Sequence, residues 1–196
     1  TLADVMGSGM ALDAMFFPKA GTGDQTGDGA VSGSLSGKGS SYEAVVTGNP
    51  LSMAGIEGVT LRLGHTNIEM DTVGESDHTE YMAGIGYAYG PLTVGYQINH
   101  REFGGVTTAN AENMSRNIHY SAAYAINDSL SISYGEAKSR EADMEGDSVE
   151  QEWDGISAGY TMGGMTISYI SGEAKNADYV ADRKEEINQI NVAVAF

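Results

Sequence analysis

The stretch that decides the fold is TEYMAGIGYAYGPLTVGYQINHRE, residues 79–102. Apolar side chains occupy every second position on both sides of Gly90-Pro91, and Gly, Ala, Met, Thr, Gln and Asn fill the positions between them. Alternation with a period of two predicts two β-strands joined by a tight turn. The segment raises the question of what its apolar face contacts, because its other face is small and polar.

The composition offers little material for a water-excluding core. A length of 196 residues fits one domain, but the chain holds 27 Gly and 11 Tyr against only 4 Phe and 1 Trp. A soluble β-sandwich of this length would carry more Leu, Ile and Phe pointing inward from its two sheets. A secreted soluble β protein is therefore the weakest of the fold alternatives.

The charge and the remaining composition exclude further classes. A formal net charge of -17 argues against nucleic acid as a partner, and the lack of cysteine excludes disulfides and thiolate metal sites. No apolar run approaches the length of a membrane helix. Residues 1–10 lack the basic start and apolar stretch of a signal peptide, so we expect a mature product or a fragment. A membrane β-barrel stays open, because only alternate residues of its strands meet lipid.

The same alternation recurs along the rest of the chain. Connections at 90–91, 127–129 and 163–164 are short, whereas those at 68–78, 103–116, 139–154 and 173–186 are long and acidic. Tight turns at one end and long loops at the other are typical of bacterial outer-membrane barrels. Backbone groups in lipid need partners within the protein, which demands a closed barrel. Nine strands are expected, at 42–48, 59–67, 79–89, 92–102, 117–126, 130–138, 155–162, 165–172 and 187–196.

The two faces of the expected strands differ consistently. One parity is apolar in strand after strand and predicts a lipid-facing surface, while the other is small or polar and suits a lumen lined by water. Seven tyrosines fall on the lipid parity, where they could form aromatic girdles at the headgroup level or serve simply as good strand formers. They are Tyr87, Tyr89, Tyr96, Tyr124, Tyr134, Tyr160 and Tyr169.

Four stretches carry a resemblance to a known family: YEAVVTGNPLSMAGIEGVTLRLGH, MAGIGYAYGPLTVGYQ, ISAGYTMGGMTISYI and the terminal INQINVAVAF. Over residues 42–196 the chain resembles the C-terminal part of general-diffusion porins of Gram-negative outer membranes, especially the alpha-proteobacterial type. The resemblance implies a trimer of antiparallel transmembrane β-barrels of about 14–18 strands, each with a water-filled channel for passive diffusion of small hydrophilic solutes and ions. It also implies contact with outer-membrane lipid and lipopolysaccharide, and recognition of Phe196 by the outer-membrane assembly machinery.

The resemblance assigns residues to a constriction. Residues 1–41 are expected to form an inward-folding or extracellular loop region, anchored by LDAMFFP (12–18), and residues 42–196 the barrel strands. A solvated strand end is the alternative for the basic residues, most of all for Arg101, which lies close to its loop. The candidates are Asp4 and Asp13 on the acidic side, Arg62, Arg101 and His119 on a basic wall, and Gln97 and Asn99 on the lumen parity.

The strand count departs from the family pattern. Single-chain bacterial barrels have an even number of strands with both ends on the periplasmic side. Nine strands therefore suggest that N-terminal strands are missing from this sequence. The competing explanation is a tenth strand within 29–39 or 2–17, which would close a small barrel with a structural, adhesion or phage-receptor role.

Two acidic segments are candidates for weak divalent-cation sites. GTGDQTGDG (21–29) resembles a calcium loop with Asp24 and Asp28 as ligands, but it lacks a terminal Glu, which favours a flexible Gly-rich segment. In the loop 141–154, Asp143, Glu145 and Asp147 could bind cations that bridge to lipopolysaccharide phosphates, or could simply be solvated. No other cofactor is expected. No enzyme is expected either, because none of the four His residues lies in a catalytic signature.

Overall fold

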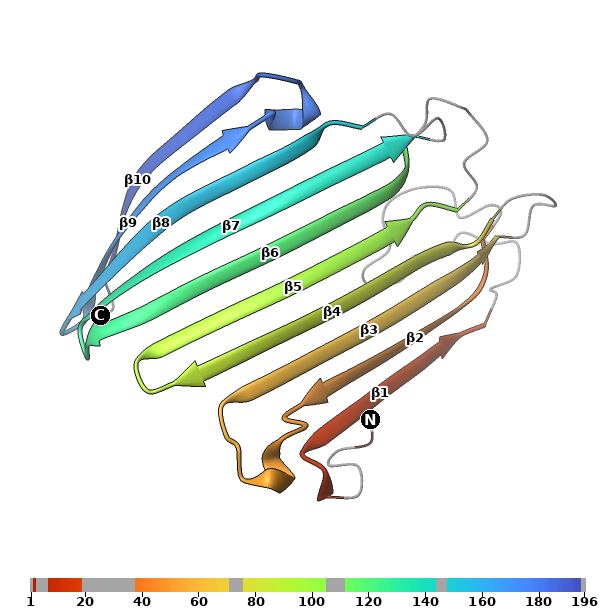
Figure 1. The fold of residues 1–196 in the computed structure, drawn as a ribbon, viewed down its shortest axis with the longest axis horizontal. Coiled ribbons are helices and arrows are strands. Elements are labelled where there is room, and N and C mark those ends of the chain that lie inside the picture. The colour runs from red at the N-terminus through yellow and green to blue at the C-terminus, as the bar shows by residue number, and fades with distance from the viewer. Residues whose placement is uncertain are drawn as a thin grey trace.

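A computed structural model describes residues 2, 7–18, 38–70, 76–104, 112–143 and 148–194 of the chain. Its strands form one antiparallel sheet in which every strand pairs with its sequence neighbours (Figure 1). Two short 3-10 helices, η2 (Ser52–Ala54) and η3 (Ala177–Tyr179), lie in connections. None of the helical segments in the described residues has the length and apolar character needed to cross a bilayer. The strands are β1 (Met10–Phe17), β2 (Lys38–Gly48), β3 (Val59–Met70), β4 (His78–Tyr89), β5 (Leu92–Glu102), β6 (Glu112–Asn127), β7 (Leu130–Asp143), β8 (Glu150–Met162), β9 (Met165–Lys175) and β10 (Lys184–Val194).

The all-β antiparallel fold predicted from the alternation is confirmed, and each of the nine expected strands is present. Two tight turns lie where the sequence places them, at Gly90-Pro91 between β4 and β5 and at Gly163-Gly164 between β8 and β9. Gly90 and Gly163 have φ values of 57° and 59°, in the left-handed region that glycine enters without steric cost. The hairpins are therefore fixed by local turn chemistry as well as by the strands.

The tenth strand corrects the assignment of residues 1–41 to a loop region. β1 pairs with β2 from Met10 opposite Gly48 to Phe17 opposite Ser41, so residues 10–17 and 38–41 belong to the sheet. The strand lies within 2–17, one of the two places where a tenth strand was weighed. Its alternation is hidden because Met15 and Phe17 put apolar groups on the same parity as Asp13. Residues 19–37, between the two strands, lie outside the described part of the chain.

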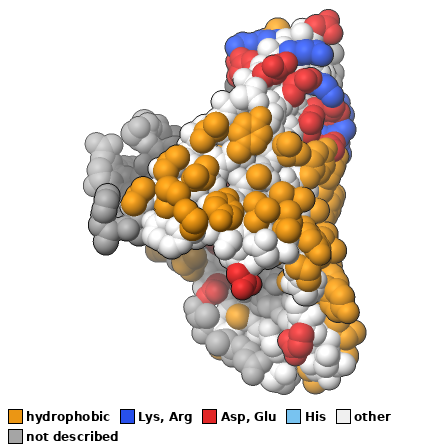
Figure 2. Space-filling view, turned by 90° about the vertical axis from the view of Figure 1, so that its left-hand side faces the viewer, with side chains coloured by type: hydrophobic (Ala, Val, Ile, Leu, Met, Phe, Trp, Pro, Cys, Tyr) orange, Lys and Arg blue, Asp and Glu red, His pale blue; other side chains and the backbone are white. Residues whose placement is uncertain are grey.

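The described residues contain almost no core. Ala142 and Ala177 are the buried hydrophobic residues among them, and thirty large apolar side chains are exposed. Figure 2 shows apolar side chains gathered in a band across one face, with the Lys and Arg side chains gathered beyond it at one end, together with many of the Asp and Glu side chains. The apolar face that the opening stretch predicts is present, and nothing in the described part of the chain covers it.

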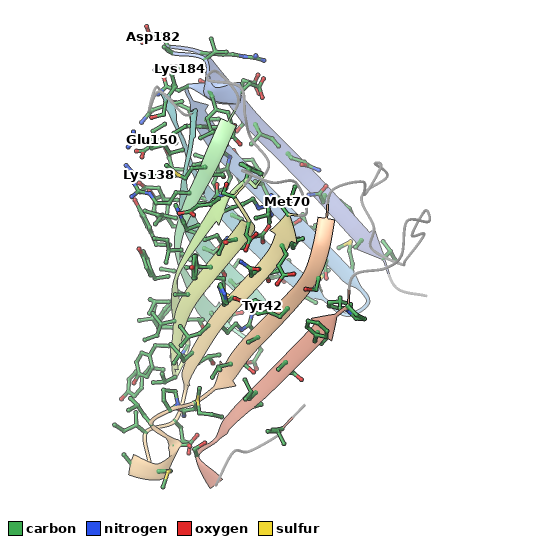
Figure 3. The ribbon with its side chains drawn as sticks, turned by 90° about the vertical axis from the view of Figure 1, so that its right-hand side faces the viewer. Tyr42, Met70, Lys138, Glu150, Asp182 and Lys184 are labelled. Carbon is green, nitrogen blue, oxygen red and sulfur yellow. The ribbon has the colours of Figure 1, made fainter. Side chains whose placement is uncertain are left out.

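The sheet is curved like a trough, with β1 and β10 at its two rims (Figure 3). Lys138 and Glu150 project outward from its convex side in that view. Residues paired in register share a face, and successive residues alternate, so the pairings assign every strand position to the convex or the concave face. Within the described ranges no pairing joins β1 to β10, so the sheet has two open edges and the described residues do not form a closed ten-stranded barrel.

The convex apolar residues form a belt that runs obliquely across the strands. On β10 the belt ends at Ile190. The row of directly paired residues that runs from Ile190 across the sheet reaches β4, six strands away, at Tyr89. On β4, however, the belt extends eight residues beyond that row, to Tyr81. Eight residues span about 27 Å and six strand spacings about 29 Å, so the edge of the belt is inclined by about 45° to the rows. That edge is marked by Tyr81, Ile98, Ile118, Tyr134, Ile156, Tyr169 and Ile190.

Candidate functional site

The concave face carries the polar residues that the sequence assigns to a lumen. Arg62 on β3, Gln97 on β5 and His119 on β6 lie in one row of paired residues, with Gly84 of β4 between the first two. Asn99 and Arg101 lie on the same face of β5, two and four residues further toward the long connections. The structure thus brings five of the candidate residues together on adjacent strands.

Arg62 is exposed and forms no hydrogen bond or ion pair within the described part of the chain. Beside it lies a shallow hollow of about 310 Å³, bordered by Gln97 and His119. The floor of the hollow is open because Gly84 and Gly86 present no side chains there. Arg62 is therefore a cation that an anionic group in solution can reach.

Glycine recurs along the row of the concave face next to Arg62. The indole of Trp153 lies over its β8 and β9 members: a Cβ on Gly155 would come within 3.1 Å of the ring and one on Gly172 within 3.2 Å. The wall is therefore thin along this row, and an aromatic ring occupies part of the space. The row consists of Gly86, Gly95, Ser121, Gly135, Gly155 and Gly172.

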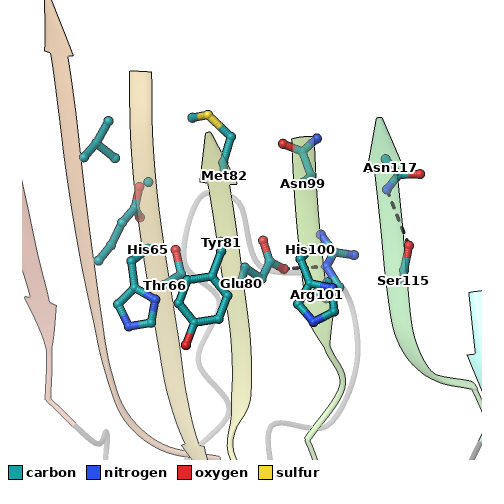
Figure 4. Close-up of a pocket in the computed structure, with 13 residues that line it drawn as sticks. His65, Thr66, Glu80, Tyr81, Met82, Asn99, His100, Arg101, Ser115 and Asn117 are labelled. Carbon is teal, nitrogen blue, oxygen red and sulfur yellow. Dashed lines mark hydrogen bonds and ion pairs between the residues drawn. The ribbon is translucent and has the colours of Figure 1, made fainter. Parts of the chain in front are cut away.

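Arg101 differs from Arg62 because it is neutralised by a neighbour. Its Nε lies 2.6 Å from Oε1 of Glu80 on β4 (Figure 4). Its guanidinium also lies 5.7 Å from the ring centroid of Phe103. The pair borders a second concave hollow, of about 340 Å³, which Asn99 and Asn117 also line. Arg101 therefore adds little net positive charge to the wall, and its assignment to a basic wall stays a prediction.

A loop that the sequence assigns to the outside folds over the concave face. Tyr179 Oη lies 2.6 Å from Oγ of Ser139, a concave residue of β7, and Asn176 Nδ2 donates to the Glu150 carbonyl at 2.8 Å. Asn176, Asp178, Tyr179 and Asp182 have positive φ, which Asn and Asp tolerate but which is strained for Tyr179. The acidity of residues 173–186 hid this inward fold, and the Asn and Asp residues between 176 and 182 were its signal.

The acidic candidates are only partly described. Asp13 lies on the concave face of β1, in the wall rather than in an inward loop, and is paired opposite Val45. Asp143 ends β7, and its side chain lies outside the described structure, as do Asp4, Asp24, Asp28, Glu145 and Asp147. The described residues hold no group of three acidic or His side chains placed to bind a metal. Phe196 is likewise outside the described residues.

Beyond the belt, the convex face of β7–β10 is charged, and we call this surface the charged extension. Lys138 Nζ lies 2.6 Å from Oε1 of Glu152 and 3.9 Å from Oε1 of Glu136. The hydrogen bond to Glu152 raises the pKa of Lys138 and lowers the pKa of Glu152. The charged extension comprises Glu136, Lys138, Arg140, Glu150, Glu152, Asp154, Glu173, Lys175, Lys184 and Glu186.

Tyrosines mark the edge between the belt and the charged extension. The hydroxyls of Tyr120 and Tyr134 both donate to the carboxylate of Glu136, the latter at 3.2 Å. At the same edge on β3 and β4, the rings of His65 and Tyr81 stack with centroids 4.7 Å apart (Figure 4). Each of the seven tyrosines expected on the apolar parity is exposed. This edge combines rings on an apolar surface with hydroxyls directed toward charge.

No protein-family model and no curated protein matches this chain, so its function is argued from the geometry above.

Proposed function

We propose that this chain forms the wall of a water-filled channel in a Gram-negative outer membrane, through which small hydrophilic solutes and ions diffuse passively. The observation that carries the proposal is the opposition of the two faces. The convex face exposes an apolar belt, whereas the concave face carries Gly and polar side chains at most positions. A surface of the first kind suits lipid, and one of the second kind suits water.

The inclination of the belt supports a membrane location. A belt that is level in a bilayer and oblique to the strands by about 45° requires the strands to tilt by that angle, which agrees with the tilt of about 35–45° of membrane barrels. The tyrosines at its edge agree with an aromatic girdle, because their rings favour apolar surroundings and their hydroxyls favour water.

The open edges of β1 and β10 require a partner in this setting. An unsatisfied backbone group costs several kcal/mol in lipid, so both edges have to be paired for a stable barrel. We infer that further strands complete a larger barrel and that the complete protein is a homotrimer, as the porin resemblance implies. The glycine row agrees with a wide lumen, because it leaves little bulk to fill a narrow one.

Selectivity would arise from charges across the lumen. Arg62 and His119 supply donors on one wall, and the acidic connections at the mouth attract cations. The cation preference should weaken as salt shortens the Debye length toward about 8 Å at 0.15 M. Sieving at a constriction, with polar solutes oriented by the local field, is the mechanism that these residues support.

Planar-bilayer recording of the native protein tests the proposal. We expect stepwise, ohmic conductance at low voltage, and Arg62→Gln should shift the reversal potential toward cation selectivity. Lys175→Gln removes a charge from the convex face and serves as the matched control, which should leave selectivity unchanged. Absence of stepwise conductance in the native protein would overturn the proposal.

A second candidate is a small closed barrel with a structural, adhesion or phage-receptor role. The described residues contain ten strands, and this even number favours it, because small outer-membrane barrels are built from even numbers. It requires β1 to pair with β10 and predicts a monomer without conductance. The intact mass of the native protein separates the two, since a larger barrel requires a mass well above 20.6 kDa.

A further inference from the structure

Two arginines lie directly opposite each other on the convex face. Arg116 of β6 is paired in register with Arg140 of β7, and His100 of β5 is the next residue in the same row. Like charges in directly opposed cross-strand positions destabilise a sheet. The pairing is conspicuous in a chain with 27 acidic residues and only 10 Lys and Arg, where carboxylates are abundant.

Neither arginine forms an ion pair with a carboxylate among the described residues. Arg116 is half-buried and has no hydrogen bond or ion pair within the described residues. Arg140 donates from Nε to Ser148 Oγ at 2.6 Å and forms no ion pair with Glu150, the acid opposite it on β8. By contrast, Lys138, two residues before Arg140 on the same face of β7, is paired with Glu152. Within the described structure, the two guanidinium groups therefore keep donors and charge that an external anion can use.

The position of the pair indicates which anion. Arg116 lies two residues before Ile118 on the convex face of β6. Ile118 marks the edge of the belt on that strand, so the pair lies just beyond the belt. Side chains of directly opposed residues start about 4.5–5.5 Å apart at Cβ, close enough for two guanidinium groups to bind one phosphate through charge-assisted hydrogen bonds. A ligand with acyl chains on the belt and a phosphate at its edge satisfies both surfaces.

We propose that Arg116 and Arg140 form a binding site for the phosphate of a membrane lipid whose acyl chains lie on the apolar belt. The site rests on the membrane location in the proposed function, but it does not depend on conduction. His100, whose Nε2 lies 3.2 Å from Oε1 of Glu102, borders the site without being free to join it in this arrangement.

Binding of short-chain phosphatidic acid to the native protein in dodecyl maltoside tests the site, with phosphatidylcholine of the same chain length as the comparison. We expect phosphatidic acid to bind at least about tenfold more tightly, a preference that Arg116→Gln/Arg140→Gln abolishes. Lys175→Gln/Lys184→Gln removes the same charge from the same face and should keep the preference. Equal loss in both double variants, or loss in neither, would overturn the proposal.

Three further readouts sharpen the test. In lipid-free detergent Arg116→Gln should raise the Tm by relieving repulsion, and with phosphatidic acid it should lower the Tm relative to the wild type. A change of the same sign in both conditions contradicts the site.

Inorganic phosphate competing as well as phosphatidic acid would show a free-anion site instead. A lipid-free oligomer that Arg116→Gln/Arg140→Gln dissociates would assign the surface to a second copy of the chain. If the native protein conducts but does not prefer phosphatidic acid, only the lipid site is contradicted. If it prefers phosphatidic acid but does not conduct, only the channel is contradicted.

Discussion

The two halves of strands β7–β10 have the same backbone arrangement and opposite chemistry on their convex face. Near the tight turns, Ile132, Tyr134 and Ile156 expose apolar groups, while beyond the belt Lys138 and Glu152 form an ion pair on the same strands. The ladder of pairings runs through the boundary without a break. The difference shows that the chemistry of the convex face changes along the strand, although the backbone pairing does not.

The largest effect is expected from placing a charge in the belt. Ile132→Arg should lower the free energy of unfolding by about 2–4 kcal/mol in lipid vesicles, because the new charge would face hydrocarbon. Glu186→Arg puts the same side chain on the charged extension, opposite Glu173, and serves as the control, with an expected change of about 0.5 kcal/mol or less. Denaturant unfolding in vesicles measures both.

Equal effects of the two substitutions would remove the distinction between the halves. In water an exposed Ile, here 47% accessible, could be replaced by Arg at little cost. The experiment therefore separates a belt that faces lipid from an apolar patch on a soluble protein.

The boundary between the apolar belt and the charged extension also explains how much of the fold could be predicted from the sequence. Ends at the tight turns, such as Tyr89 and Met162, were predicted correctly, because turn residues and apolar alternation stop together there. At the other end, the expected limits of Lys138 and Gly155 fall short of Asp143 and Glu150. In the charged extension both faces are polar, so the hydropathy period disappears while the backbone pairing continues.

The site could be predicted only in part for a related reason. Parity along single strands places Arg62, Gln97 and His119 on one face, but only the register puts them in one row. The ion pair of Arg101 and the Arg116–Arg140 pairing depend on which residues of neighbouring strands are opposed. That information lies in turn lengths and bulges across the whole sheet, which alternation within one strand does not contain.

A smaller effect is expected on the concave face, at the glycine row. A Cβ on Gly155 would lie 2.9 Å from the Ser171 carbonyl oxygen and 3.1 Å from the Trp153 ring, so Gly155→Ala should cost about 1–3 kcal/mol. Gly159→Ala, where the nearest atom is Ser131 Oγ at 3.5 Å, is the matched control and should be nearly neutral. The same unfolding measurement compares them, and a neutral Gly155→Ala would show that Trp153 is not held against this row.

The smallest effect is expected from Lys138→Met in the charged extension. The Lys138–Glu152 pair is solvent-accessible, so its loss should lower the Tm slightly, and the difference from wild type should vanish in about 1 M salt. Because the pKa of Glu152 is lowered in the folded protein, the stability that the pair contributes is lost as the pH falls through the folded-state pKa of Glu152. Because the pKa of Lys138 is raised, the same stability is lost as the pH rises through the folded-state pKa of Lys138. The Tm difference should therefore be constant from about pH 6 to 9. A salt-insensitive loss comparable to that of Ile132→Arg would contradict a solvated extension and would place Lys138 in the same surroundings as the belt.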